Sequence, residues 1–391
     1  MSGVTRIVTA CVVLLGGWAT ALQSQEDTTE VDRPMVRGDM YDKPYLAQLA
    51  GRTAVGGYVE AHARYARVDG VKEEFTFLAK RFNLFFASQI SDFIRFAAEL
   101  EFEDAAEEIN LEFAAVDFLI SRALAFRAGM ILVPLGRFNL SHDSPLNEFT
   151  DRPLVSTQVF GVALSEPGIG ALGIFPVGSA GRITYQVYAV NGFDDGLITD
   201  SDGTRIPEGR RNFEDNNNSP SFVGRVAWSP RIGIELGASL HTGPYNVFQL
   251  DGMEIDQKRN LTIWVLDLEA DFLGIRWEGE GGQARIDVPA GLLGIFAERQ
   301  QGFYFQGMWD FGRQWIRTMP KSFFSVGARV DVLDLDADIS GDSVKQISLG
   351  FNFRPTGETV FKFNYVRGRA RDRFNNPSDF ADFLFSVATY F

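Results

Sequence analysis

The sequence contains a single cysteine, Cys11, which lies in an N-terminal segment that we expect to be removed on export. The mature chain is then predicted to have no disulfide bond, thiolate metal site or cysteine nucleophile. Beyond residue 21 the sequence also lacks any run of about eighteen apolar residues, which excludes a helical membrane protein. Lys and Arg number 37 against 51 Asp and Glu, and the formal charge of −14 argues against a nucleic-acid partner.

Aromatic residues and glycine, by contrast, are abundant. The chain has 35 Phe, 10 Tyr and 6 Trp, together with 39 Gly. In membrane-spanning barrels, aromatic side chains face lipid or headgroups, and glycine serves tight turns and close contacts between strands. The composition is therefore that expected of strands that face lipid.

The first residues have the features of an export signal. One positive charge, Arg6, precedes an apolar run over residues 7–15, and a small-residue pattern ending at Ala21 suits signal peptidase. A lipoprotein signal ending at Cys11 is the alternative, but the apolar core mostly follows that cysteine instead of preceding it. We predict a cleaved signal peptide over residues 1–21 and a destination in the envelope of a Gram-negative bacterium or outside it.

From about residue 53 onward, apolar and polar side chains alternate with the period of a strand. In a soluble sandwich the same alternation would place the charged side chains in solvent, so the choice of a barrel depends on the even number of segments and on their connections. The predicted fold is all-β, a transmembrane antiparallel β-barrel of about 16 strands. The predicted strands are 53–65, 74–88, 94–103, 109–119, 123–134, 158–166, 182–192, 221–229, 231–241, 260–272, 273–281, 301–312, 322–332, 344–354, 358–367 and 380–391.

The last predicted strand ends at Phe391, with Val387, Phe385 and Phe383 at alternate positions before it. It resembles the C-terminal segment of bacterial outer-membrane barrels, although Thr389 stands where an aromatic residue is common. We expect this strand to pair with the first one, which leaves no free edge in lipid. The resemblance implies recognition of this strand by the barrel-assembly machinery.

The connections support the same topology. Outer-membrane barrels have short periplasmic turns and longer external loops. With the barrel over residues 53–391 and a periplasmic segment over 22–52, the predicted periplasmic connections are mostly short, except for 167–181. The predicted long connections are 136–157, 193–220, 242–259, 282–300 and 368–379.

Several short motifs resemble one family. The run over residues 127–138, which ends in Pro134-Leu-Gly136-Arg-Phe, and the later Asn147-Glu-Phe-Thr-Asp-Arg-Pro-Leu154 are similar to a passage of the phosphate- and polyphosphate-selective porins. Residues 185–192, 223–226 and 326–331 are similar to later strands of that family. The resemblance implies a sixteen-stranded barrel, commonly a homotrimer, that forms a passive channel. It also implies that the third external loop folds inward and narrows the pore.

In this sequence the third external loop is 136–157, and it carries donors and acceptors of both signs. Rings of such side chains set which ions pass. The loop candidates are Arg137, Asn139, His142, Asp143, Asn147, Glu148, Asp151 and Arg152, and an ion pair that only ties the loop to the wall is the alternative role for the last two. The predicted lumen-lining residues are Arg81, Arg95, Glu99, Glu101, Arg127, Arg225, Asp267, Glu269, Arg276, Glu278 and Arg329. Because arginines and carboxylates share this register, we predict either weak selectivity or a preference for a solute other than phosphate.

Two other classes of function remain open at this stage. A hydrolase would need Ser, His and a carboxylate in mutual reach, but the adjacent Ser141, His142 and Asp143 do not provide that geometry. A non-conducting scaffold barrel is the second alternative, although about sixteen strands should leave an aqueous bore. We predict no catalytic site, cofactor or metal, and we expect outer-membrane lipid and lipopolysaccharide as partners.

Overall fold

The computed structural model describes residue 40 and residues 53–391. The predicted signal peptide, with Cys11, and nearly all of the predicted periplasmic segment 22–52 lie outside the described residues. Within the described part of the chain, no helix is both long enough and apolar enough to cross a membrane.

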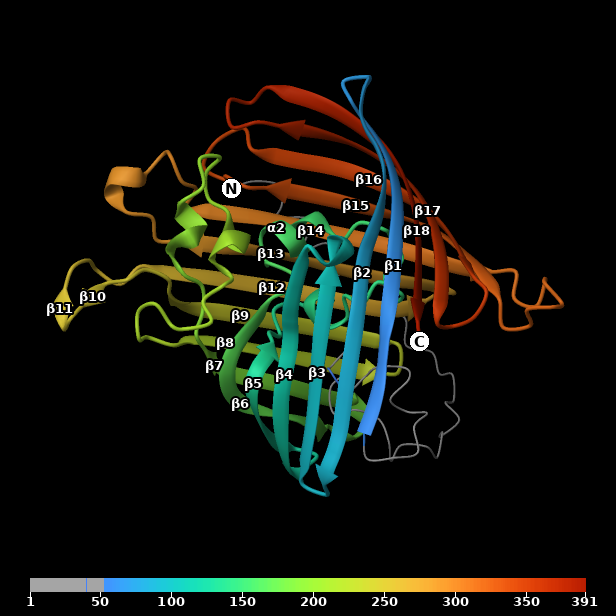
Figure 1. Cartoon of the computed structure of the whole chain (residues 1–391), viewed down its shortest axis with the longest axis horizontal. Helices are drawn as coiled ribbons and strands as arrows, with labels where there is room; N and C mark the ends of the chain where they lie inside the picture. The colour runs from blue at the N-terminus through green and yellow to red at the C-terminus, as the bar shows by residue number, and fades with distance from the viewer. Residues whose placement is uncertain (1–39, 41–52) are drawn as a thin grey trace. The chain divides into compact units, whose positions relative to one another are not determined.

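Sixteen antiparallel strands form a closed barrel (Figure 1). Each strand pairs with its neighbours in sequence, and β1 pairs with β18 to close the ring. The barrel strands are β1 (Thr53–Val68), β2 (Val71–Ser91), β3 (Ile94–Glu103), β4 (Glu108–Ser121), β5 (Leu124–Leu132), β6 (Ser165–Pro176), β7 (Arg182–Val190), β8 (Ser221–Arg231), β9 (Ile234–Pro244), β12 (Asn260–Phe272), β13 (Ile275–Ile286), β14 (Arg299–Phe311), β15 (Phe323–Asp334), β16 (Ser343–Arg354), β17 (Thr359–Arg371) and β18 (Pro377–Tyr390). A small separate hairpin, β10 (Gln249–Leu250) with β11 (Met253–Glu254), lies in the connection between β9 and β12.

The two faces of the strands differ as the alternation predicts. On β1 and β2, Val59 and Phe77 are 42% and 75% exposed, whereas Glu60 and Arg81 on the other face are 1% and 9% exposed. Because successive side chains of a strand point to opposite faces, each strand presents an apolar register outward and a largely polar register inward.

The two ends of the barrel carry different connections. Residues 92–93, 122–123, 177–181, 232–233, 273–274 and 355–358 form short turns at one end, and 312–322 is the one longer connection there among the described residues. Long loops at 133–164, 191–220, 245–259 and 287–298 leave the other end. Following the rule for outer-membrane barrels, we refer to the short-turn end as periplasmic and to the other end as external.

The sixth strand was predicted wrongly. Residues 158–164 of the predicted strand 158–166 belong to the β5–β6 connection, and β6 (Ser165–Pro176) lies mostly within the stretch 167–181 that was predicted to be a long turn. The apolar run before Ser165 packs in the interior of the protein, which explains why it resembles a strand. The glycines of β6 have close neighbours: a Cβ at Gly170 would lie 2.0 Å from the carbonyl oxygen of Val187. With this correction the turn between β6 and β7 is reduced to residues 177–181, consistent with a short periplasmic connection.

The barrel closes next to the last residue of the chain. The backbone N–H of Phe391 donates to the carbonyl of Gly57 at 3.0 Å, and the Phe391 ring stacks on Phe82 with centroids 5.8 Å apart. Tyr58 and Tyr390 pack edge to face on the inner side. The expected pairing of the first and last strands is confirmed.

Candidate pore constriction

The β5–β6 connection, residues 133–164, is held by hydrogen bonds to the buried register of the barrel wall. A loop that faced only solvent would have few such partners. The hydrogen bonds join Gly136 N to Ser239 Oγ (3.1 Å), Phe138 N to Glu280 Oε1 (2.5 Å), Ser144 Oγ to Glu60 Oε2 (2.5 Å), Thr150 N to Asn364 Oδ1 (2.8 Å), Leu154 N to Asp331 Oδ1 (3.1 Å), Asn352 Nδ2 to Glu148 Oε2 (2.9 Å) and Tyr390 OH to Asp143 Oδ2 (2.7 Å). The partners lie on β1, β9, β13 and β15–β18, so the connection contacts the inner face of much of the wall.

The C-terminal half of the connection is apolar. It includes the short helix α2 (Leu154–Gln158), and the buried side chains of Val155, Val159 and Phe160 belong to one hydrophobic cluster with wall residues. The wall contributes buried apolar residues of β7, β8, β12, β13, β14 and β15, among them Val223 and Ile263. Burial of these side chains stabilises this half of the connection mainly through non-directional contacts, in addition to the hydrogen bonds from Leu154 N to Asp331 and from Ser156 Oγ to Glu280.

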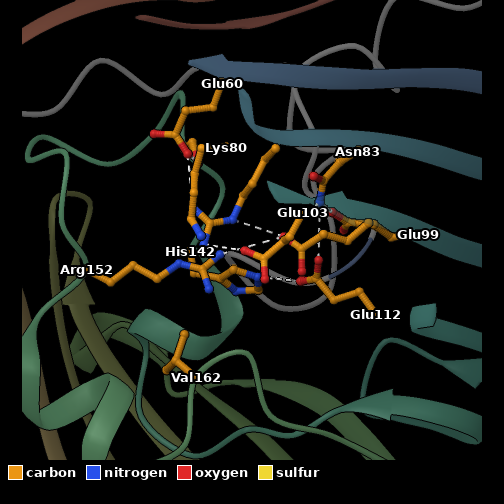
Figure 2. A network of polar contacts seen from close by, with 12 residues as sticks. Glu60, Lys80, Asn83, Glu99, Glu103, Glu112, His142, Arg152 and Val162 are labelled. Atoms are coloured by element: carbon orange, nitrogen blue, oxygen red, sulfur yellow. Dashed lines mark hydrogen bonds and ion pairs between the residues drawn. The ribbon is translucent and has the colours of Figure 1, made fainter. Parts of the chain in front are cut away.

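The N-terminal half faces a polar part of the wall formed by β1–β4 (Figure 2). Arg81 on β2 is surrounded by three carboxylates from β1 and β3. Its Nη1 lies 3.0 Å from Glu60, its Nε lies 3.2 Å from Glu101, and its Nη2 lies 2.5 Å from Glu103. One guanidinium group therefore compensates several buried acids.

Two side chains of the connection join this polar network. His142 pairs with Glu112 on β4, and its other ring nitrogen lies 2.7 Å from the carbonyl oxygen of Asn139. Arg152 Nη2 lies 3.9 Å from Glu101, beyond hydrogen-bonding distance, and the exposed fraction of the Arg152 side chain is 12%. The network can thus both anchor the connection and present charge to a solute that passes it.

Glu148 is the main ionic anchor of the connection. Its carboxylate lies 2.8 Å from Arg276 on β13 and 3.6 Å from Arg354 on β16, and it accepts a hydrogen bond from Asn352. Burial alone would raise the pKa of Glu148, but Arg354, Arg276 and the hydrogen bond from Asn352 outweigh burial and lower it. The carboxylate is therefore ionised at neutral pH.

Further ion pairs lie on the wall itself. Arg127 donates two hydrogen bonds to Asp117, at 2.7 and 2.9 Å, and Arg95 binds the same carboxylate. Arg225 donates to Asp267 at 3.0 and 2.5 Å. These arginines of the inner register are thus bound to carboxylates of the same register.

The residues predicted for the constriction all lie on the β5–β6 connection. Asn139, His142, Asp143 and Glu148 are buried, and the Asn147 side chain donates to the carbonyl of His142. The alternative role for Asp151 and Arg152 was an ion pair that ties the connection to the wall. Among the ion pairs of the described residues, the contact between Arg152 and Glu101 is the one that fits this role. The predicted lumen residues occupy the inner register, and most of them are buried: Arg81, Glu99, Glu101, Arg127, Arg225, Asp267 and Arg329. The others are Arg95, 13% exposed, Glu269, 17%, Arg276, 41%, and Glu278, which accepts a hydrogen bond from Tyr304.

Several residues that hold the connection were not predicted from the sequence. They are Glu60, Glu112, Glu280, Asp331, Asn352, Arg354 and Lys362. Most of them are polar residues between apolar or aromatic neighbours, as Lys362 is between Phe361 and Phe363. This alternation identifies the side chains that point inward, but it does not predict which loop each of them contacts.

Comparisons with known proteins agree on the fold. No protein-family model matches the chain. An uncharacterized protein of Aquifex aeolicus is 24% identical over 359 residues, which is 84% of this chain and 78% of that protein. The outer membrane channel DcaP of Acinetobacter baumannii is 12% identical, with 87% of this chain and 97% of that chain covered and a TM-score of 0.56. OmpF of Salmonella typhi is 10% identical over 87% of this chain and 97% of that one, with a TM-score of 0.55.

A third similar structure is the trimer form of OmpT, an outer membrane protein of Vibrio cholerae. It is 9% identical, covers 87% of this chain and 100% of that chain, and has a TM-score of 0.53. At such low identity a likeness is informative about the fold alone. The chain therefore has the closed sixteen-stranded barrel of the outer-membrane porins.

Proposed function

We propose that this protein is a channel in the bacterial outer membrane through which small solutes or ions diffuse passively. One observation carries the proposal, namely a closed barrel whose outward register is apolar and exposed while its inward register is polar. Such a wall is stable only with hydrocarbon outside, because an open sheet edge or an apolar exterior in water would be costly.

In the proposed channel the β5–β6 connection is the constriction. The loop residues predicted from the sequence, together with Glu60, Glu101 and Arg276 on the wall, would line or support the narrowest part. The inner register mixes arginines with carboxylates at hydrogen-bonding distance. We therefore propose weak selectivity, with no dedicated site for phosphate despite the sequence resemblance to phosphate-selective porins.

The test is conductance in planar bilayers with the purified full chain. We expect stable channels and no block by micromolar phosphate in chloride solutions. The proposed lack of phosphate selectivity is wrong if micromolar phosphate blocks the chloride current, and the channel itself is wrong if correctly inserted protein conducts nothing.

The second candidate is a non-conducting scaffold barrel, and the packing of the interior favours it. A large hydrophobic cluster and many buried ion pairs occupy space between the connection and the wall. Swelling of liposomes in sugars of increasing size distinguishes the two functions, because only a channel admits the smaller sugars. Neither candidate includes catalysis.

The proposal extends to assembly and location. A homotrimer is supported by the trimer form of the structurally similar OmpT. Lipid, lipopolysaccharide and the barrel-assembly machinery, acting on the strand that ends at Phe391, are the further partners proposed. Mass measurement of the detergent-solubilised protein tests the oligomeric state.

A further inference from the structure

The outward face of the barrel is hollowed between β1, β2 and β15–β18. The hollow is a groove of about 630 Å³. Its exposed side chains are aromatic or aliphatic, and Leu349, Phe363 and Phe383 are 50%, 48% and 59% exposed. The apolar and aromatic residues that line it are Ala63, Tyr65, Phe75, Val326, Leu349, Phe351, Phe363, Tyr365, Phe383, Leu384 and Phe385.

The groove follows neighbouring rows of paired residues across six strands, from Phe75 near the external end of β2 to Val326, three residues after the periplasmic start of β15. On β1 it begins at Ala63, six residues beyond the backbone contact of Gly57 with Phe391 at the periplasmic end. The strand then continues only to Val68, where the external turn begins. In an outer membrane the β1–β2 end of the groove would therefore face the acyl chains of the outer leaflet.

A row of cations lies directly above this groove on the same face. Arg67 follows Tyr65, and Arg367 follows Tyr365, by two residues, a step of about 7 Å along a strand that keeps the side chain on the same face. Arg67 pairs in register with Lys72 on β2, and Lys345 on β16 pairs with Arg369 on β17. All five side chains are exposed.

The row stands out because the chain as a whole is acidic, with a formal charge of −14. Within the described part of the chain, Lys72 and Lys345 have no ion-pair partner, whereas Arg369 binds Asp379 at 2.6 Å and Arg367 interacts with the same carboxylate at longer range. The Lys72 ammonium lies 5.6 Å from the ring centroid of Phe75, a groove residue. Glu73 is the exposed acid nearest in sequence to the row, beside Lys72. An excess of cations over carboxylates above an apolar groove matches an anionic headgroup that carries acyl chains.

We propose that this groove and its cationic rim bind a phosphorylated lipid of the outer leaflet, with acyl chains in the groove and phosphate on Lys72, Lys345 and Arg367. The inference depends on the proposed location in the outer membrane, but not on conduction. Arg67, whose guanidinium donates to the carbonyl of Gly70, and Arg369 would form the edges of the phosphate site.

The test compares three variants of the full chain in vesicles of phosphatidylethanolamine with and without lipopolysaccharide. The rim variant is Lys72→Ala/Lys345→Ala/Arg367→Ala. The matched control, Lys258→Ala/Arg285→Ala/Arg299→Ala, removes three exposed cations near the external ends of β12–β14. The third variant, Ala63→Trp, fills the groove and leaves the rim intact. Lipopolysaccharide bound to each purified protein is measured by native mass spectrometry and by titration, and conductance is recorded on the same preparations.

At roughly fivefold in affinity for each basic residue near an anionic lipid surface, the rim variant, which lacks three, is expected to bind lipopolysaccharide about 100-fold more weakly. The control should bind as the wild type does, and Ala63→Trp should bind more weakly while its rim is unchanged. Equal binding by the rim variant and the wild type overturns the site. If inorganic phosphate displaces lipopolysaccharide at the same concentration as the lipid phosphate, the site recognises phosphate alone, and the proposal of a lipid ligand is wrong. Loss of conductance with lipid binding intact would contradict only the proposed channel.

Discussion

The two halves of the β5–β6 connection are held to the barrel wall by different forces. Residues 154–164 are held by a hydrophobic cluster, in which Val155 and Phe160 are almost completely buried. Residues 137–152 are held mainly by ion pairs and hydrogen bonds, with Glu148 bound by Arg276 and Arg354. Apolar packing is non-directional and independent of pH, whereas an ionic anchor depends on geometry and protonation.

The difference suggests a division of roles. The apolar half is expected to stay packed whenever the barrel is folded. The polar half keeps charged groups beside the proposed path of solutes, and each of its anchors can be removed by one substitution.

Phe160→Ala should reduce the free energy of unfolding by about 3–5 kcal/mol, because it removes a buried ring and leaves a cavity in the apolar cluster. Unfolding in denaturant, followed by tryptophan fluorescence and by mobility in gels, measures the change. The control is Phe126→Ala, whose ring is 47% exposed on the outward face and is replaced there by lipid or detergent. Equal destabilisation by both substitutions would contradict the distinct role of the apolar half.

Glu148→Gln should cost less, about 1–3 kcal/mol, because the amide keeps the shape of the side chain but loses the charge that binds two arginines. Arg276 is 41% exposed, and solvent weakens its ion pair with Glu148, so we expect the loss of unfolding free energy to lie near the lower end of this range. In bilayers we expect larger and noisier conductance, because the polar half is released while the apolar half stays packed. Glu298→Gln, an exposed external carboxylate, is the control. Unchanged noise and stability would show that Glu148 is not the anchor.

The same anchor predicts a pH dependence. Because the pKa of Glu148 is lowered below its ordinary value, its ionised form stabilises the folded state at pH values above that ordinary value. This contribution is lost only as the pH falls through the lowered pKa. The difference in unfolding free energy between wild type and Glu148→Gln should therefore be constant from neutral pH to about 4.5, then shrink in stronger acid. A difference that disappears between pH 7 and 5 would contradict the assigned pKa direction.

Arg152→Gln should have the smallest effect, a shift toward cation permeability of less than about fivefold, since a partly solvated charge is worth at most about 1 kcal/mol. Reversal potentials in a potassium chloride gradient measure the ratio. Arg211→Gln is the control, because that side chain is 74% exposed on an external loop. A shift of the same size in both variants would assign the effect to overall charge and not to the connection.

The barrel could be predicted from the sequence because the alternation of side chains is local. Residues 94–103 show both registers within ten positions, and the structure places Glu99 inward and Leu100 outward as expected. The sixth strand could not be found in this way. The glycines of β6 weaken its alternation, and the apolar run before it, which includes Val159 and Phe160, is apolar because it packs inside the protein.

The constriction was only partly predictable. Its length and its residues of both signs are visible in the sequence, and the loop candidates do lie together on one connection. Their partners could not be assigned, because Asp143 meets Tyr390 and Thr150 meets Asn364 across more than two hundred residues of chain. Such pairs depend on the shear of the barrel, since a shift of one residue in any strand would turn the partner to the opposite face.

The attachment of one connection to most strands of the wall has a consequence for how the protein can change in evolution. A replacement on a distant strand, such as Asn364 or Lys362, alters a support of the connection as directly as a replacement within it. Among divergent homologues, positions 142–154 and their partners on the wall should therefore vary together in pairs, whereas the outward-facing positions of the same strands should drift independently.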